Sequence, residues 1–94
     1  MANNLRTLKK DIDYLVDEAI ADCCTFRSFR PETEETVYEI IDEVVTLRNN
    51  LYSKVNNRQD NPAKPYFKAI KEELIAGVDA AYDRLSSLIK KEAK

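Results

Sequence analysis

The apolar residues between positions 37 and 55 recur at steps of three and four, which is the period of an α-helix. Strict alternation, which would indicate a β-strand, fits nowhere in this stretch. The apolar face is the widest in the chain, so we expect this middle helix to be the hub on which two other helices pack. Its members are Val37, Ile40, Ile41, Val44, Leu47, Leu51 and Val55.

The segments on either side of the middle helix show the same period. Asn3 and Asn4 are good N-caps for a first helix, and Pro31 disfavours helical geometry in the residue before it. A third helix is expected to start between Pro62 and Pro65, after a polar loop. The two apolar stripes are Leu5, Leu8, Ile12, Leu15, Val16, Ala19, Ile20, Cys23 and Phe26, and then Phe67, Ile70, Leu74, Val78, Ala81, Leu85 and Leu88, flanked by Tyr82 and Ile89.

These stripes predict an all-α fold, an antiparallel up-down three-helix bundle. We expect a single domain over residues 1–94, with helices at about 4–28, 32–57 and 64–92. One glycine and three prolines in 94 residues offer too little turn chemistry for a β-sandwich or barrel. The glycine, Gly77, lies inside the third helix, where it costs about 1 kcal/mol relative to alanine. A close helix–helix crossing would explain it.

Charge and hydropathy limit the expected location and partners. The net charge of −2 does not predict binding to nucleic acids or membranes. No stretch approaches the roughly 18 apolar residues of a membrane span, and the N-terminus lacks the hydrophobic region of a signal peptide. We therefore expect a cytoplasmic protein with no membrane partner, for which nucleic acid is not the favoured partner.

The chain lacks the residues that most catalytic mechanisms require. The absence of histidine removes the commonest general base and the commonest metal ligand. Cys23 and Cys24 are adjacent, so a disulfide between them would be strained, and their neighbours do not lower a thiol pKa. A phosphate-binding glycine loop and a nucleophile elbow are both missing. We expect no enzyme, no cofactor and no bound metal.

The apolar arc of the middle helix is wider than one neighbouring helix requires. At about 100° per residue it covers roughly 180°, whereas an ordinary surface helix needs somewhat more than ~100°. Packing against two neighbours uses part of the excess. The remainder, Tyr38, Val45 and Tyr52, is a candidate interface with a second copy of the chain or with another protein. The alternative is that these tyrosines are half-buried at the rim with solvated hydroxyls.

The charges divide unevenly between the two ends of the expected bundle. The half that contains residues 1–14, 46–61 and 62–77 has nine cationic and five anionic residues, and the other half has six and twelve. Cations near the N-termini of the first and third helices are mildly unfavourable, which suggests an anionic partner. Chance and solubility are the alternative. The candidate patch is Arg6, Lys9, Lys10, Arg48, Lys54, Arg58, Lys64 and Lys68.

The carboxylates include one partial enzyme motif, and carboxylate oxygens are ligands that magnesium accepts. Glu39-Ile40-Ile41-Asp42 resembles half of the signature of the all-α nucleoside triphosphate pyrophosphatases. The resemblance implies a helical bundle, magnesium and paired acidic helix motifs. The other half of the signature has two acids, two spacer residues and a third acid. Asp17, Glu18 and Asp22 are the nearest match, but the third acid comes one position late, because Ala21 stands where it belongs. A solvated acidic face is the alternative.

A second resemblance concerns the fold. The stretches DIDYLVDE at 11–18 and LRNNL at 47–51 resemble small uncharacterised all-helical bacterial proteins of about this length. The resemblance would cover most of the chain, and it implies the helical fold and no activity.

Together these patterns predict a small non-enzymatic interaction or scaffold protein that associates with itself through the middle helix. The alternative is a binding module that offers its basic end to an anionic protein, nucleotide or nucleic acid. A magnesium-dependent pyrophosphatase-like enzyme is the third hypothesis.

Overall fold

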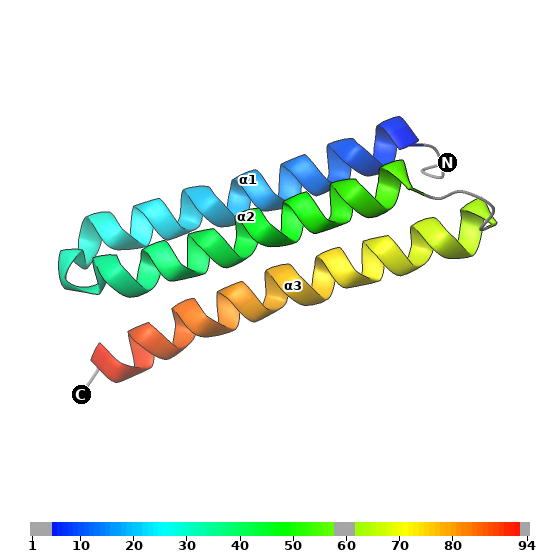
Figure 1. Ribbon diagram of the computed structural model, residues 1–94. Coiled ribbons are helices and arrows are strands. Elements are labelled where there is room, and N and C mark those ends of the chain that lie inside the picture. The colour runs from blue at the N-terminus through cyan, green and yellow to red at the C-terminus, as the bar shows by residue number, and fades with distance from the viewer. Residues whose placement is uncertain (1–4, 58–61, 93–94) are drawn as a thin grey trace.

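The computed structural model describes residues 5–57 and 62–92, with the side chains of 7–57 and 62–89. Three α-helices lie alongside one another (Figure 1), and the described residues include no strand. The prediction of an all-helical chain with three helices is confirmed. The elements are α1 (Leu5–Phe29), the short 3-10 helix η1 (Pro31–Thr33), α2 (Glu34–Asn56) and α3 (Ala63–Glu92).

The turn between α1 and α2 is built around Pro31 and Thr33. The backbone N–H of Arg30 donates to the carbonyl of Phe26 (2.9 Å) and closes α1. Pro31 then opens the 3-10 helix, and the Thr33 hydroxyl donates to the Arg30 carbonyl (2.7 Å). These local bonds occupy the residues that we expected to begin the second helix, so α2 starts at Glu34 instead of near residue 32.

The third helix starts where the prolines predict. It begins at Ala63, and Pro65 occupies its first turn, where the missing N–H of proline costs no helical hydrogen bond. The Tyr66 hydroxyl donates to the carbonyl of Lys54 (2.7 Å), which joins the start of α3 to the end of α2. The polar loop expected before the third helix reaches no further than Pro62, and its residues 58–61 lie outside the described part.

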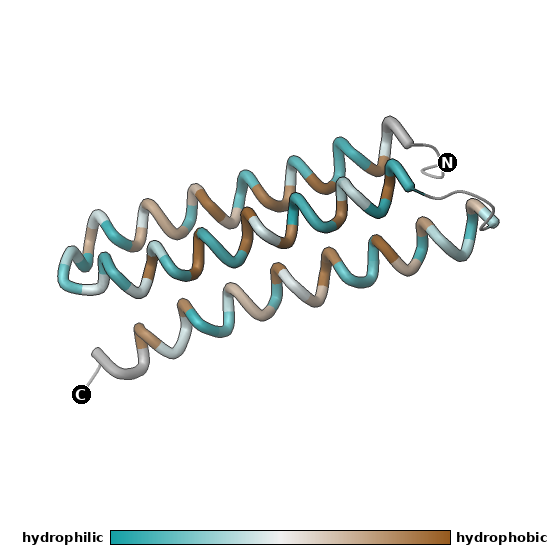
Figure 2. The backbone as a smooth tube through the Cα atoms, in the orientation of Figure 1, coloured by the Kyte–Doolittle hydropathy of each residue, from teal (hydrophilic) through white to brown (hydrophobic). Residues whose placement is uncertain are grey.

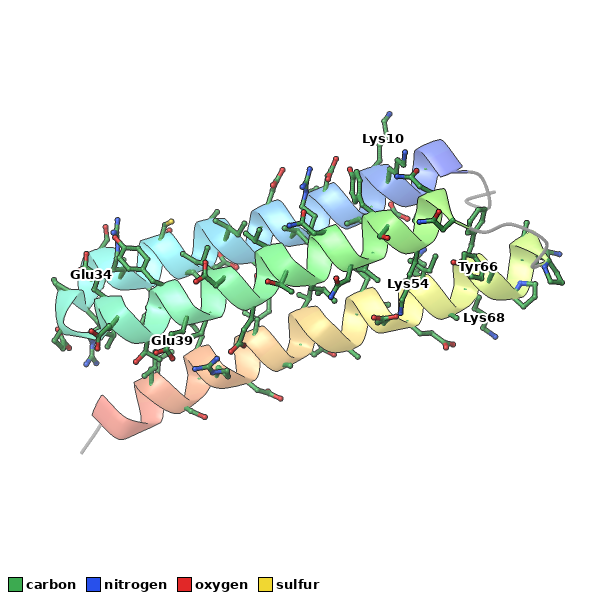
Figure 3. All side chains as sticks on the ribbon, in the orientation of Figure 1. Lys10, Glu34, Glu39, Lys54, Tyr66 and Lys68 are labelled. Atoms are coloured by element: carbon green, nitrogen blue, oxygen red, sulfur yellow. The ribbon has the colours of Figure 1, made fainter. Side chains whose placement is uncertain are left out.

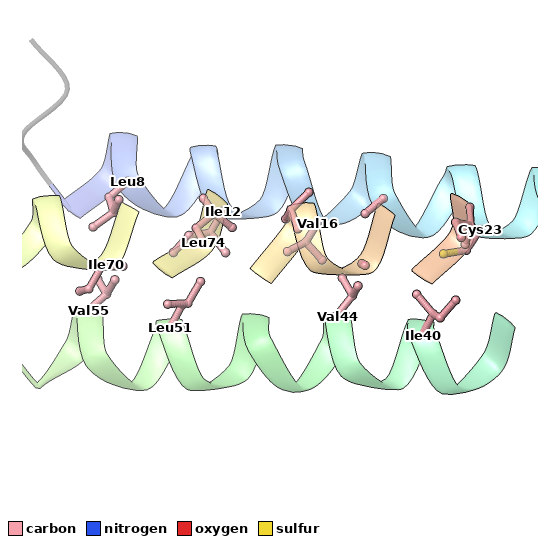
Figure 4. Close-up of a cluster of buried hydrophobic side chains, with 14 of the residues drawn as sticks. Leu8, Ile12, Val16, Cys23, Ile40, Val44, Leu51, Val55, Ile70 and Leu74 are labelled. Carbon is pink, nitrogen blue, oxygen red and sulfur yellow. The ribbon is translucent and has the colours of Figure 1, made fainter. Parts of the chain in front are cut away.

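The core lies on the long axis between the three helices. Apolar positions face inward and polar positions face solvent (Figure 2). Side chains from α1, α2 and α3 meet there in successive layers (Figure 4). Every buried apolar residue belongs to one of the three predicted stripes: Leu8, Ile12, Val16, Ala19 and Cys23; Val37, Ile40, Val44, Leu51 and Val55; Phe67, Ile70, Leu74, Val78, Ala81 and Leu85.

Gly77 marks a close approach of α3 to α2, as its place in the sequence predicted. A Cβ atom built on Gly77 would lie 2.5 Å from Cδ2 of Leu47, well inside van der Waals contact. Since α2 packs closely on both neighbours, and α1 and α3 touch each other less extensively, α2 is the hub of the fold.

Residue pairs between helices show how each helix runs relative to its neighbour. Asp13 of α1 pairs with Arg48 of α2, and Arg27 further along α1 pairs with Glu34 near the start of α2. Between α1 and α3 the order is the same in both helices, because Asp11 pairs with Lys71 and Asp22 with Tyr82. The described helices include none with the length and hydropathy to cross a membrane.

Candidate functional site

The candidate interface on the middle helix faces α1, and its two ends are bonded to that helix. The Tyr52 hydroxyl donates to Oδ1 of Asp13 (2.7 Å), and Arg48 forms an ion pair with the same atom (3.4 Å). The Arg48 guanidinium lies 4.7 Å from the centre of the Tyr52 ring, and the Lys9 ammonium lies 5.7 Å from it. Burial and the hydrogen bond to Asp13 raise the pKa of the Tyr52 phenol.

Tyr38 has a similar arrangement at the other end of the stripe. Arg27 of α1 donates to the Tyr38 hydroxyl and stacks its guanidinium 5.4 Å from the ring centre. The hydroxyl in turn donates to Oε2 of Glu34 (3.2 Å). Tyr38 is still 47% exposed and Val45 is 37% exposed. Contact of this stripe with a second copy stays a prediction. We call this surface the α1–α2 face: Asp13, Arg27, Glu34, Tyr38, Val45, Arg48 and Tyr52.

Much of the candidate basic patch is engaged inside the chain. Arg48 is paired with Asp13, Lys54 reaches Glu73 of α3 (2.7 Å), and Lys9 lies over the Tyr52 ring. The neighbouring Lys71 is paired with Asp11 (3.5 Å). Lys10, Lys64 and Lys68 are exposed and make no ion pair with another described residue. The Arg6 side chain and Arg58 lie outside the described residues.

The acidic motif of the enzyme hypothesis contacts a cation from α3. Arg84 pairs with Glu39 (3.3 Å) and with Glu43, one turn further along α2, and the hydrogen bond to Glu43 raises the pKa of the guanidinium. Figure 3 shows Glu39 on the side of α2 that faces the C-terminal part of α3. Within residues 5–57 and 62–92, no group of three or more acidic or thiol side chains could hold a metal ion.

The two cysteines have different environments. Cys23 is buried in the core, and burial, followed by the neighbouring Cys24 and Asp22, raises the pKa of its thiol. Cys24 is exposed on the next position of α1. The predicted core position of Cys23 is confirmed.

A further surface lies between α1 and α3, and our sequence analysis missed it. Two contacts cross it: the ion pair of Asp11 with Lys71, and the hydrogen bond from the Tyr82 hydroxyl to Asp22. Between these contacts lie Tyr14, 66% exposed, and Ile75, 47% exposed. The only sequence signal was that both are large apolar residues outside the core stripes.

We call this surface the α1–α3 face. It consists of Asp11, Tyr14, Glu18 and Asp22 of α1 and Lys68, Lys71, Ile75, Asp79 and Tyr82 of α3.

No protein-family model, curated protein or solved structure matches this chain. The two resemblances noted above therefore depend on their quoted residues alone, and the function has to be inferred from the exposed surfaces.

Proposed function

We propose that this chain is a non-enzymatic helical interaction protein that associates with itself. The observation that supports the proposal is the exposure of large apolar side chains on the helix bodies, outside a core that is already filled. Tyr14, Tyr38, Val45, Ile75 and Ile89 are each at least one-third exposed. Tyr38 and Val45 lie on the α1–α2 face and Tyr14 and Ile75 on the α1–α3 face, and exposed apolar patches are typical of interaction sites.

The proposal also concerns how the three helices are arranged within one copy. In it, the three helices form an up-down bundle closed within one copy, and copies associate by their outer faces without exchanging helices. The residue pairs between α1 and α2 run in opposite order along the two helices, which supports this arrangement. Every buried side-chain nitrogen and oxygen in the described part has a hydrogen-bond partner within one copy.

The test is molar mass in solution by light scattering across a concentration series. A dimer or larger species whose population rises with concentration is the expected result. A monomer at every concentration would contradict self-association. Val45→Glu then tests the middle helix, where a charge at an exposed position leaves the core intact. Loss of the oligomer in Val45→Glu, with unchanged helical circular dichroism, would place the interface on the α1–α2 face.

A second candidate function is binding of an anionic partner at the basic end. The observation that favours it is that Lys10, Lys64 and Lys68 are exposed without an ion pair in the described part of the chain, and Figure 3 shows Lys10 and Lys68 projecting away from the bundle. Binding of heparin or a single-stranded oligonucleotide should weaken with added salt and in Lys10→Glu with Lys64→Glu. Equal binding by the variant would contradict this function.

A further inference from the structure

The α1–α3 face has an apolar centre with opposite charges on either side of it. Tyr14 and Ile75 form the centre. Lys68 lies two turns before Ile75 on α3, and Asp79 lies one turn after it, so the three share one face of the helix. On α1, Glu18 follows Tyr14 by one turn. The α3 part of the face therefore shows the order cation, apolar residue, anion.

These charges are available for contacts outside the chain. Glu18, Lys68 and Asp79 are all exposed, and none forms an ion pair with another described residue. The α1–α2 face differs, because Arg48 is paired with Asp13 and Arg27 with Glu34. A second copy would thus find unpaired charges on the α1–α3 face and paired charges on the α1–α2 face.

We propose that two copies of this chain dock through their α1–α3 faces in antiparallel orientation, about a two-fold axis that passes near Tyr14 and Ile75. The proposal rests on the self-association proposed above and assigns its surface and its symmetry.

The charge order selects the antiparallel arrangement. A parallel arrangement would bring Lys68 near the basic end of the other copy and Asp79 near its acidic end, and like charges that face each other across an interface are unfavourable. When one copy is reversed, Lys68 of each copy comes to the level of Asp79 of the other. One symmetric interface therefore contains this pair twice.

The charge pair on α3 fixes the position of the axis along the bundle. The midpoint between Lys68 and Asp79 is next to residue 74 on α3. Residues 14 and 74 lie at the same level, because Asp11 pairs with Lys71 and Asp22 with Tyr82, with the same sequence offset in both cases. The two-fold axis that pairs Lys68 with Asp79 thus passes through the apolar centre.

The size of the face fits a specific interface. The bundle extends over 51 × 21 × 17 Å, so a long side has room for the ~800 Å² that each partner buries in an interface of standard size. An apolar centre with a polar rim is the usual anatomy of such interfaces.

Charge reversal tests the proposal. Lys68→Glu places two carboxylates opposite each other at two symmetric positions, so we expect the dimer dissociation constant to rise about tenfold. Asp79→Lys should have a similar effect. The double variant Lys68→Glu with Asp79→Lys restores opposite charges between copies and should return the constant to within about threefold of the original.

The matched control is Asp42→Lys, which reverses an exposed carboxylate on the outer side of α2, away from the α1–α3 face. It should leave the dissociation constant unchanged. Circular dichroism and thermal unfolding verify that each variant folds, which we expect because none of the substituted side chains is buried or ion-paired.

Cross-linking provides an independent test. In a Cys24→Ala background, a short bismaleimide should join two copies of Ile75→Cys near the axis and leave Val45→Cys uncross-linked. The opposite result, with Val45→Cys joined and Ile75→Cys not, would place the interface on the α1–α2 face.

The outcomes separate the two proposals. A chain that is monomeric at every concentration contradicts both self-association and the assigned surface. A dimer that is insensitive to Lys68→Glu and Asp79→Lys contradicts the surface alone. Single reversals that weaken the dimer without rescue in the double variant contradict the antiparallel pairing.

Discussion

The two faces that flank α1 differ in how many of their exposed side chains are bonded within the chain. Both have a tyrosine bonded to a carboxylate of α1: Tyr52 to Asp13 on the α1–α2 face, and Tyr82 to Asp22 on the α1–α3 face. On the α1–α2 face, arginines also cover the tyrosine rings and pair with the nearby carboxylates. On the α1–α3 face, Tyr14 and Ile75 lie uncovered beside unpaired charges. On the first face the arginines and carboxylates are paired within one chain, while Tyr38 and Val45 stay partly exposed. The second face leaves both apolar surface and unpaired charge for a partner.

The largest expected effect contrasts the core with the open face. Leu51 of α2 is fully buried, whereas Ile75 is about half exposed. Leu51→Ala should lower the free energy of unfolding by about 3 kcal/mol, because it removes buried methyl groups and leaves a cavity. Ile75→Ala should change it by less than about 0.5 kcal/mol at concentrations where the chain is monomeric. Urea denaturation measures both. A large loss in Ile75→Ala would mean that this residue belongs to the core.

A smaller effect is expected from the tyrosine hydroxyls of the two faces. Tyr52→Phe removes a hydrogen bond to Asp13 and should destabilise the chain by about 1 kcal/mol. Tyr14→Phe is the matched control, because no hydrogen bond of the Tyr14 hydroxyl is found in the described part, and it should be close to neutral. Thermal unfolding of the two variants gives the comparison. Equal destabilisation by both variants would contradict the description of Tyr52 as a tyrosine whose hydroxyl is bonded to α1.

The smallest effect concerns the pH dependence of the Tyr82 contact. Burial, followed by the hydrogen bond to Asp22, raises the pKa of Tyr82 above its ordinary value of 10.0. Above about pH 10 the unfolded chain loses this proton while the folded chain keeps it, so the folded state becomes less stable as pH rises. The stabilisation is fully present below pH 10.

The control for this pH dependence is Tyr82→Phe, which has no phenol to ionise. The fall in stability between pH 9 and pH 12 should be shallower in this variant than in the original chain. Urea denaturation at several pH values measures the difference. Identical slopes would show that the Tyr82 hydroxyl does not bond to Asp22 in solution.

The secondary structure and the core followed from local patterns. The apolar period alone located the sixteen buried apolar residues of the described part, because a helix that buries one face must repeat apolar residues at steps of three and four. The prolines placed the start of α3 correctly. The start of α2 was missed by two residues, since the 3-10 helix depends on the bonds that Thr33 makes to the Arg30 carbonyl.

The contacts on the candidate surfaces were harder to predict from the sequence. The sequence showed that the apolar arc of the middle helix is wider than its packing requires. It did not show that Tyr52 and Tyr38, at the edge of this arc, are bonded to Asp13 and Arg27 of α1. The uneven division of charge between the two ends of the bundle was also visible in the sequence, yet several cations of the basic end are paired with residues of another helix. A pattern along one helix says nothing about which residue of another helix lies opposite, because that depends on the relative position of the two helices.

By itself, the sequence determined the helices, their inward faces and the residues of the core. Only the tertiary structure decided on which side of the α1–α2 pair the third helix packs. The inward stripes are compatible with either side, because burial of a stripe depends on the angle of a residue around its own helix. Once α3 lies beside Asp11 and Asp22, Tyr14 and Ile75 share one surface. On the other side, the same two residues would lie on different surfaces.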